Sequence, residues 1–233
     1  MKLHFDLATV LRGDYGALFL HGVELTLAMA GLAWCLSLVV GILLTLIRLT
    51  NRRPATLFVA TFVAYHRNVP TLVQILFWYF GISTLLPMPL QDWLNQYNGQ
   101  FIFAVIAIGL CSGAYLSEDI RSGLRAISYG QYEASRALGL NFVSGMRYVI
   151  LPQALRNSIP PMVNHAVVLF KNTSLAMAIG AAELTYVTRK VENETFLSFE
   201  SYLIATVLYL ALSLVIMLAG ARIAAHYRIP GVR

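Results

Sequence analysis

Charged side chains are scarce in this sequence. Asp, Glu, Lys and Arg make up 12% of its 233 residues, whereas about 25% is usual for soluble globular domains. Hydrophobic residues make up 58%, and the mean hydropathy is +0.67. A chain this apolar does not match a soluble domain, and we identify it as an integral membrane protein.

Side chains that react or bind metals are also few. Cys35 and Cys111 both fall within apolar runs, where we expect them to pack rather than to pair or bind metal. The five histidines show no HExxH or paired-ligand spacing, so no metal site is predicted. The sequence also has no GxxxxGK[ST] phosphate loop, which excludes ATP hydrolysis by this chain. An intramembrane enzyme would need a nucleophile, paired carboxylates or metal ligands at membrane depth, and Glu118 alone does not form such a set.

Apolar runs predict five transmembrane helices. A helix rises 1.5 Å per residue, so about 20 apolar residues cross the roughly 30 Å hydrocarbon core. We place the spans at residues 25–47, 54–81, 101–118, 157–182 and 201–221. Residues 119–156 are too rich in charge for lipid and form a predicted cytosolic loop. The predicted fold class is an all-α integral membrane protein with residues 1–233 as a single domain.

The basic residues predict the orientation of the chain. Of the 17 Lys and Arg residues, eleven flank the spans on the side of the 119–156 loop, four lie in the other loops, and two lie within spans. This asymmetry places the N-terminus outside and the C-terminus in the cytosol. Because the cations border apolar segments instead of clustering on one face, the net charge of +6 does not indicate a nucleic-acid partner.

The most distinctive stretch is residues 131–161, QYEASRALGLNFVSGMRYVILPQALRNSIPP. Residues 133–138 are mostly good helix formers, and Gly139 stands where a left-handed residue would end a helix. A second short helix is predicted from about 141 to 150, bounded by Pro152. Two short helices of this kind would form a projection that a cytosolic partner could bind. The alternative is an amphipathic loop that lies on the membrane surface.

This stretch resembles the EAA loop of bacterial ATP-binding-cassette importer permeases. The matching positions are Glu133, Ala134, Gly139, Leu151 and Pro152, with Ser135 in place of the second alanine and Val149 in place of isoleucine. The resemblance implies a type I importer permease fold in the bacterial inner (cytoplasmic) membrane. It also implies that these positions, Ser135 included, couple the subunit to a cytosolic ATPase.

The same resemblance implies a set of partners. The ATPase subunits would bind ATP and Mg²⁺, and this subunit would carry no cofactor. A second permease subunit, identical or homologous, would complete the translocation path. A periplasmic or lipid-anchored amino-acid-binding protein would deliver the substrate.

Two cations lie inside the predicted spans. Arg67 follows Pro54 by 13 residues and Lys171 follows Asn157 by 14, so both lie about 20 Å along helical spans. Intramembrane charge normally faces a bundle interior or a wet cavity, which makes both cations candidate substrate-path residues. Their polar neighbours complete the candidate path: Asn68 and Gln74 beside Arg67, and Asn172, Thr173 and Ser174 beside Lys171.

This arrangement has two interpretations. The two cations could together receive a small anion, Arg67 as a bidentate fork and Lys171 as a point charge. Alternatively, one or both bond helix carbonyls or Glu118 and only fix the packing. His165 is predicted to be packed and hydrogen-bonded rather than to relay protons.

Further stretches resemble polar amino acid permeases. Residues 66–74, HRNVPTLVQ, resemble the second-span motif of that family, and residues 169–175, LFKNTSL, resemble its fourth-span motif. Gly113-Ala114-Tyr115 with Glu118 and Arg121 resembles the stretch before the loop. Asp119, where the family prefers an apolar residue, and Ser128-Tyr129, in place of a common Pro-Lys, depart from the pattern.

Two details resemble glutamate/aspartate permeases in particular: Asn-Val-Pro at 68–70 and Arg-Ile-Pro-Gly at 228–231. The resemblance thus implies the permease subunit of an ATP-driven importer of polar amino acids, with glutamate and aspartate as substrates. The alternative is a secondary amino acid transporter that needs no ATPase. Such a protein would typically couple through membrane carboxylates and show two related halves.

Overall fold

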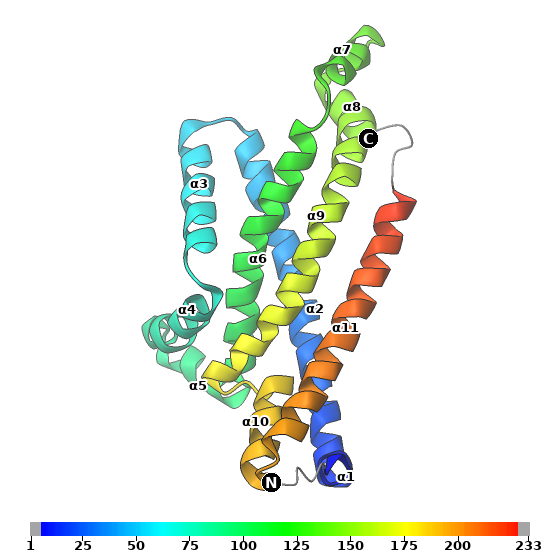
Figure 1. Cartoon of the computed structure of the whole chain (residues 1–233). Helices are drawn as coiled ribbons and strands as arrows, with labels where there is room; N and C mark the ends of the chain where they lie inside the picture. The colour runs from blue at the N-terminus through cyan, green and yellow to red at the C-terminus, as the bar shows by residue number, and fades with distance from the viewer. Residues whose placement is uncertain (1–5, 228–233) are drawn as a thin grey trace.

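The computed structural model describes residues 6–227, and every regular element in that range is helical (Figure 1). The α-helices are α1 (Leu7–Leu11), α2 (Asp14–Leu49), α3 (Arg53–Asn68), α4 (Thr71–Leu76), α5 (Met88–Gln96), α6 (Gly99–Arg125), α7 (Tyr129–Ala137), α8 (Phe142–Gly145), α9 (Leu151–Asn172), α10 (Leu184–Thr195) and α11 (Ser198–His226). The π-helical turns are η1 (Phe77–Gly81) and η3 (Met146–Ile150), and the 3₁₀ turns are η2 (Ile82–Leu85) and η4 (Thr173–Ile179). The prediction of an all-α fold is confirmed. The 228–231 motif lies outside the described residues.

Three of the described helices, α2, α6 and α11, are long and apolar enough to cross a membrane. A fourth candidate is the helical run Phe142–Ile179, which meets α10 at a bend of 49°. The predicted spans at 25–47, 101–118 and 201–221 each lie inside a longer helix of the structure. The helices extend further because residues that flank each apolar run are helical as well.

The predicted span at 54–81 is not one continuous helix, and this part of the prediction was wrong. The helix α3 ends at Asn68, Val69 is extended with φ −95° and ψ 127°, and α4 begins at Thr71. The cause is Pro70, which has no N–H to donate and disfavours a helical conformation in the residue before it. In Figure 1, α4 turns away from the axis of α3.

Close contact between α2 and α6 forms the centre of the bundle. A β-carbon added at Gly113 would lie 2.7 Å from Val40 Cγ1, and one at Gly109 would lie 2.7 Å from Leu36 Cδ2. Small residues of this kind let membrane helices approach closely. A glycine also allows α9 to pack closely against α11. A β-carbon added at Gly220 would lie 2.3 Å from Val163 Cγ1.

The outward faces of α2 and α11 are apolar and exposed. Leu43 on α2 and Leu210 on α11 are 51% and 58% exposed, as expected for side chains that face lipid. Cys35 also lies on an exposed part of α2, so the prediction that it packs was wrong, whereas Cys111 is buried as predicted. Both cysteines are free.

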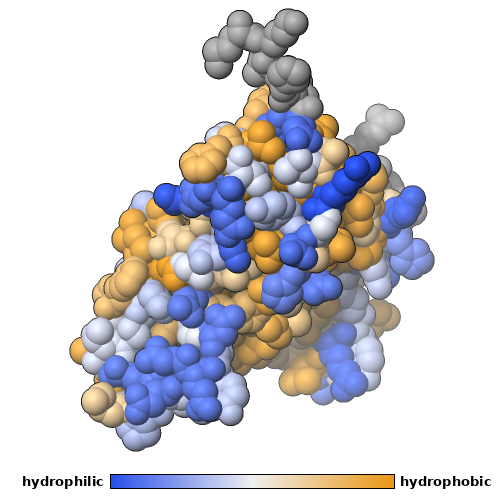
Figure 2. Space-filling model, turned by 90° about the horizontal axis from the view of Figure 1, so that it is seen from below, coloured by the Kyte–Doolittle hydropathy of each residue, from blue (hydrophilic) through white to orange (hydrophobic). Residues whose placement is uncertain are grey.

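The two ends of the bundle differ. At one end α7 protrudes beyond the long helices (Figure 1). Figure 2 views the opposite end, where hydrophilic residues gather in patches between hydrophobic ones. There α10 contributes the exposed Lys190, Asn193 and Glu194. The two ends of the bundle therefore differ in shape, because one carries the protruding α7 and the other carries the polar residues of α10.

Candidate functional site

The helix α7 ends as the sequence predicts. Gly139 has φ +75°, in the left-handed region. Its N–H donates to the Arg136 carbonyl at 2.9 Å, and the Leu140 N–H donates to the Ser135 carbonyl at 3.1 Å. These two bonds form a Schellman motif, the turn that favours glycine after the last helical residue. The turn sends the chain back toward the bundle after only nine helical residues.

Packing between α7 and α8 depends on small side chains. Ser135 is the one buried residue of α7, and its hydroxyl donates to the Tyr132 carbonyl at 2.8 Å. A β-carbon added at Gly145 of α8 would lie 3.1 Å from Ser135 Oγ. Glu133 and Ala134 are exposed on the protruding helix, so both are open to a partner.

The predicted end of the second short helix at Pro152 was wrong. The π turn η3 continues from α8 directly into α9, and Leu151 and Pro152 form the first turn of α9. The Leu151 N–H donates to the Met146 carbonyl, five residues back. Pro152 has no N–H to donate back into η3, and the helical run nevertheless continues through it into α9. The loop predicted to extend to residue 156 therefore ends earlier, inside the helical run.

Arg67 lies in the last turn of α3. Its guanidinium carbon lies 5.5 Å from the centre of the Tyr115 ring on α6, a cation–π contact. Arg67 also lines a pocket of about 340 Å³ between α2, α3 and α6, together with Asn68, Arg48 and Glu118. The Asn68 amide donates to the Ala64 carbonyl at 2.7 Å. Arg67 and Asn68 thus border one polar cavity.

Gln74 was predicted to lie in the substrate path beside Arg67, and the structure places it elsewhere. Its side chain is completely buried, and its amide nitrogen donates to the carbonyls of Val69 at 2.8 Å and His66 at 3.1 Å. Its amide oxygen lies 2.6 Å from His66 Nδ1. These bonds satisfy backbone groups that the break at Pro70 leaves without helical partners. Gln74 therefore supports the break and does not border the cavity beside Arg67.

Lys171 lies in the last turn of α9 and is exposed. The Thr173 hydroxyl is buried and donates to the Phe170 carbonyl at 2.7 Å, while Ser174 donates to the Lys171 carbonyl at 2.7 Å. Asn172 is partly buried. Within residues 6–227, no hydrogen bond or ion pair connects Lys171 with Arg67. The structure thus keeps the two cations on separate helices, α3 and α9.

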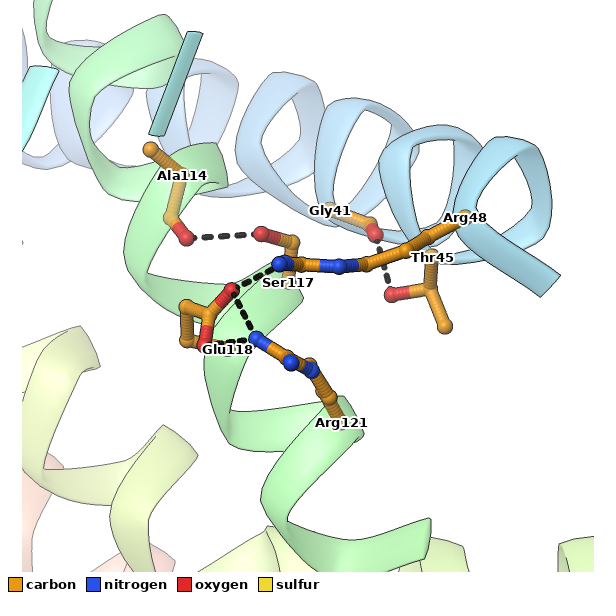
Figure 3. A network of polar contacts seen from close by, with 7 residues as sticks. All are labelled: Gly41, Thr45, Arg48, Ala114, Ser117, Glu118 and Arg121. Atoms are coloured by element: carbon orange, nitrogen blue, oxygen red, sulfur yellow. Dashed lines mark hydrogen bonds and ion pairs between the residues drawn. The ribbon is translucent and has the colours of Figure 1, made fainter. Parts of the chain in front are cut away.

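Figure 3 shows an ionic group that the sequence analysis did not assemble. Glu118 on α6 accepts from Arg48 on α2 at 2.5 Å and from Arg121 at 3.1 Å. The alternative in which Glu118 pairs with Arg67 or Lys171 was therefore wrong. The only sequence signal was the fixed i, i+3 spacing of Glu118 and Arg121. Arg48 is 70 residues away in sequence and joins only through the α2–α6 contact.

A second polar contact involves Asp119, the residue that departs from the family pattern. His165 Nδ1 on α9 lies 2.5 Å from Asp119 Oδ2 on α6, and its ring lies 5.1 Å from the Tyr115 ring. The prediction that His165 is packed and hydrogen-bonded is confirmed. Tyr115 thus contacts both His165 and Arg67, which joins α3, α6 and α9 in one polar layer.

Comparison with known proteins places this geometry in a family. Residues 37–229 match the family described as "Binding-protein-dependent transport system inner membrane component". The glutamine transport system permease protein GlnP of Escherichia coli is 35% identical over 85% of this chain and 88% of its own length. The glutamate/aspartate import permease protein GltJ of Escherichia coli is 29% identical over 90% and 87%, and the arginine transport system permease protein ArtQ of Bacillus subtilis is 31% identical over 86% and 88%.

Solved structures agree with these relatives. A crystal structure of an amino acid ABC transporter with histidines matches with a TM-score of 0.84 and 29% identity, covering 96% of this chain and all of that one. An inward-facing structure of the MetNI methionine ABC transporter matches the fold with a TM-score of 0.72. The family match sets aside the secondary transporter and the intramembrane enzyme. This chain belongs to the inner membrane components of binding-protein-dependent transport systems and is the permease subunit of an amino acid ABC importer.

Proposed function

We propose that the importer carries polar amino acids and that glutamate and aspartate are its substrates. Such a substrate carries two carboxylates and one ammonium group. Arg67 offers a guanidinium fork at a polar cavity, and the Glu118 carboxylate in that cavity is already paired with two other arginines. Within residues 6–227 the Arg67 guanidinium has no carboxylate partner, and this unpaired cation is the observation that carries the proposal. The relative named for glutamate and aspartate supports it.

The test is uptake in liposomes that contain this permease, its ATPase and its binding protein. Unlabelled glutamate and aspartate should suppress uptake of labelled glutamate, whereas glutamine and arginine should not. Arg67→Gln and Lys171→Gln should each reduce uptake at limiting substrate, and unchanged uptake in either variant would assign that cation to packing. The matched control is Arg156→Gln, an exposed arginine on α9. If glutamine competes better than glutamate, the substrate assignment is wrong.

We further propose that α7 couples the subunit to a cytosolic ATPase, which binds ATP and Mg²⁺ itself. Three features support this role: α7 protrudes from the bundle, Glu133 is exposed on it, and Gly139 ends it with a sharp turn. Glu133 would make a charge-assisted bond to the ATPase. ATP binding would close the ATPases and turn the paired permeases outward, and hydrolysis would reset them.

The coupling role is tested by charge reversal on α7. Glu133→Lys should abolish co-purification with the ATPase and leave membrane insertion intact. Glu194→Lys, an exposed residue of α10 at the other end of the molecule, is the matched control. Normal co-purification of Glu133→Lys would show that α7 does not carry the contact.

The remaining partners and the orientation complete the proposal. A second permease subunit would share the path, a binding protein would deliver substrate on the α10 side, and the N-terminus would lie outside with the C-terminus cytosolic. Cysteine labelling tests the orientation in a chain where Cys35 and Cys111 are alanine. A membrane-impermeant thiol reagent should label Ser128→Cys only in inside-out vesicles and Asn193→Cys only in right-side-out vesicles. The reverse pattern would overturn the orientation.

A further inference from the structure

A second, larger pocket lies at the end of the bundle where α7 protrudes. It measures about 490 Å³ and is enclosed by the last turns of α2 and α6, the first turns of α3, and α7. Three arginines are among the residues that line it, Arg48, Arg121 and Arg125. It is separate from the Arg67 cavity, with which it shares only Arg48.

The charge in this pocket is unbalanced. Arg48 and Arg121 share one carboxylate, that of Glu118. Arg125 is exposed in the last turn of α6, and it has no ion pair within residues 6–227. Among the described residues that line the pocket, none is acidic. Two positive charges in excess therefore face one pocket, which favours an anionic ligand.

Neutral donors accompany the arginines. Asn51, which carries a side-chain amide, and Thr56, which carries a hydroxyl, both line the pocket. Asn51 has φ +56°, and this left-handed residue makes the turn that joins α2 to α3 beside the arginines. A fork of guanidinium groups together with amide and hydroxyl donors fits the oxygens of a phosphate group.

Most of the remaining lining residues are apolar, namely Leu44, Leu49, Val59, Leu124 and Ile127. Leu44 and Val59 are buried at 4% and 0% exposure, whereas Leu49 at the edge is 51% exposed. A soluble anion gains nothing from such a wall, but a lipid acyl chain does. Basic pockets between transmembrane helices at the cytosolic face are suited to anionic headgroups.

We propose that this pocket binds the phosphate group of an anionic phospholipid of the inner leaflet, with an acyl chain against Leu49. The position on the inner leaflet rests on the orientation proposed above. Tyr132 of α7 also lines the pocket. A bound lipid therefore braces α7 against α2 and α6, and anionic lipid favours the geometry in which α7 meets its partner.

The test uses the purified permease–ATPase complex in nanodiscs of phosphatidylglycerol and phosphatidylcholine, followed by native mass spectrometry. Wild-type complex should retain phosphatidylglycerol. Because one arginine near an anionic surface changes binding by about fivefold, Arg125→Gln should retain about fivefold less, and Arg125→Glu less again. Arg156→Gln, an exposed arginine outside the pocket, should retain as much as wild type.

Three outcomes would overturn the proposal. Equal retention by Arg125→Gln and wild type would remove Arg125 from any lipid site. An inorganic phosphate adduct that depends on Arg125, without bound lipid, would make the ligand a soluble anion. If the variants fail to assemble, crosslinking of a photoactivatable phosphatidylglycerol to the wild-type complex tests the lipid site instead. Crosslinks at the ends of α2, α3 and α6 support the site, and crosslinks only elsewhere refute it. None of these readouts depends on which amino acid is transported.

Discussion

Replacing Gly139 by alanine measures how much the turn after α7 depends on a left-handed backbone conformation. Gly139 has φ +75°, and a β-carbon added there meets no atom within 4 Å. The substitution therefore creates no clash and removes no contact, so its only local cost is that of a left-handed backbone in an L-residue. That cost is roughly 1–2 kcal/mol, equivalent to a factor of about 5–30 in the population that holds the turn.

A graded series and a matched glycine make the prediction specific. Asn tolerates the left-handed region better than Ala, and a β-branched residue tolerates it worst. Affinity for the ATPase should therefore fall in the order Gly139, Asn, Ala, Val. Gly130 is the control, because it also has open space around its β-position but lies in α7 without a positive φ. Gly130→Ala should leave affinity unchanged or raise it, since Ala favours a helix by about 1 kcal/mol.

The assay is binding of the ATPase to permease in nanodiscs, combined with ATPase stimulation by the binding protein. Gly139→Ala should raise the dissociation constant by about 5–30-fold, while far-UV circular dichroism and membrane insertion stay the same. If Gly139→Val bound the ATPase with wild-type affinity, the reasoning would be refuted. The left-handed turn would then not be required in the complex with the ATPase.

Two further substitutions test the packing of the bundle. Gln74→Leu should lower the free energy of unfolding by about 1–3 kcal/mol, because the Val69 carbonyl loses its side-chain donor and the His66 carbonyl keeps only the weak Cys111 thiol. Chemical denaturation in detergent measures this change, and an unchanged midpoint would show that the break at Pro70 does not need Gln74. Gly113→Val should destabilise by about 1–3 kcal/mol, because its β-carbon would press on Val40. Gly31→Val on α2, where no atom lies within 4 Å, is its control, and equal effects of the two would argue against a tight α2–α6 contact.

Local chemistry made part of the structure predictable. The apolar runs identified α2, α6 and α11 because a long charge-free segment has few alternatives to a membrane helix. Gly139 was placed correctly because a glycine after a helix-forming run is a strong local signal. Both inferences need only neighbouring residues.

The errors and omissions arose where distant groups decide the outcome. Pro70 gave a local signal for a break. The change of chain direction at this break also depends on Gln74, whose side chain donates hydrogen bonds to the freed carbonyls. Pro152 was read as the end of a helix, although the helical run passes through it from η3 into α9. The Arg48–Glu118 pair could not be derived, because it follows from the close crossing of α2 and α6.

The unbroken run from α8 through η3 to α9 has a mechanical consequence. Phe142 to Asn172 forms a helical rod of about 45 Å at 1.5 Å per residue. A tilt of about 5° at one end would move the other by roughly 4 Å over that length. Pro160 and Pro161 remove two backbone donors partway along it, and prolines inside a helix are the usual sites of bending. In the proposed coupling, the stiffness at these prolines determines how far a displacement of α8 is transmitted to Lys171.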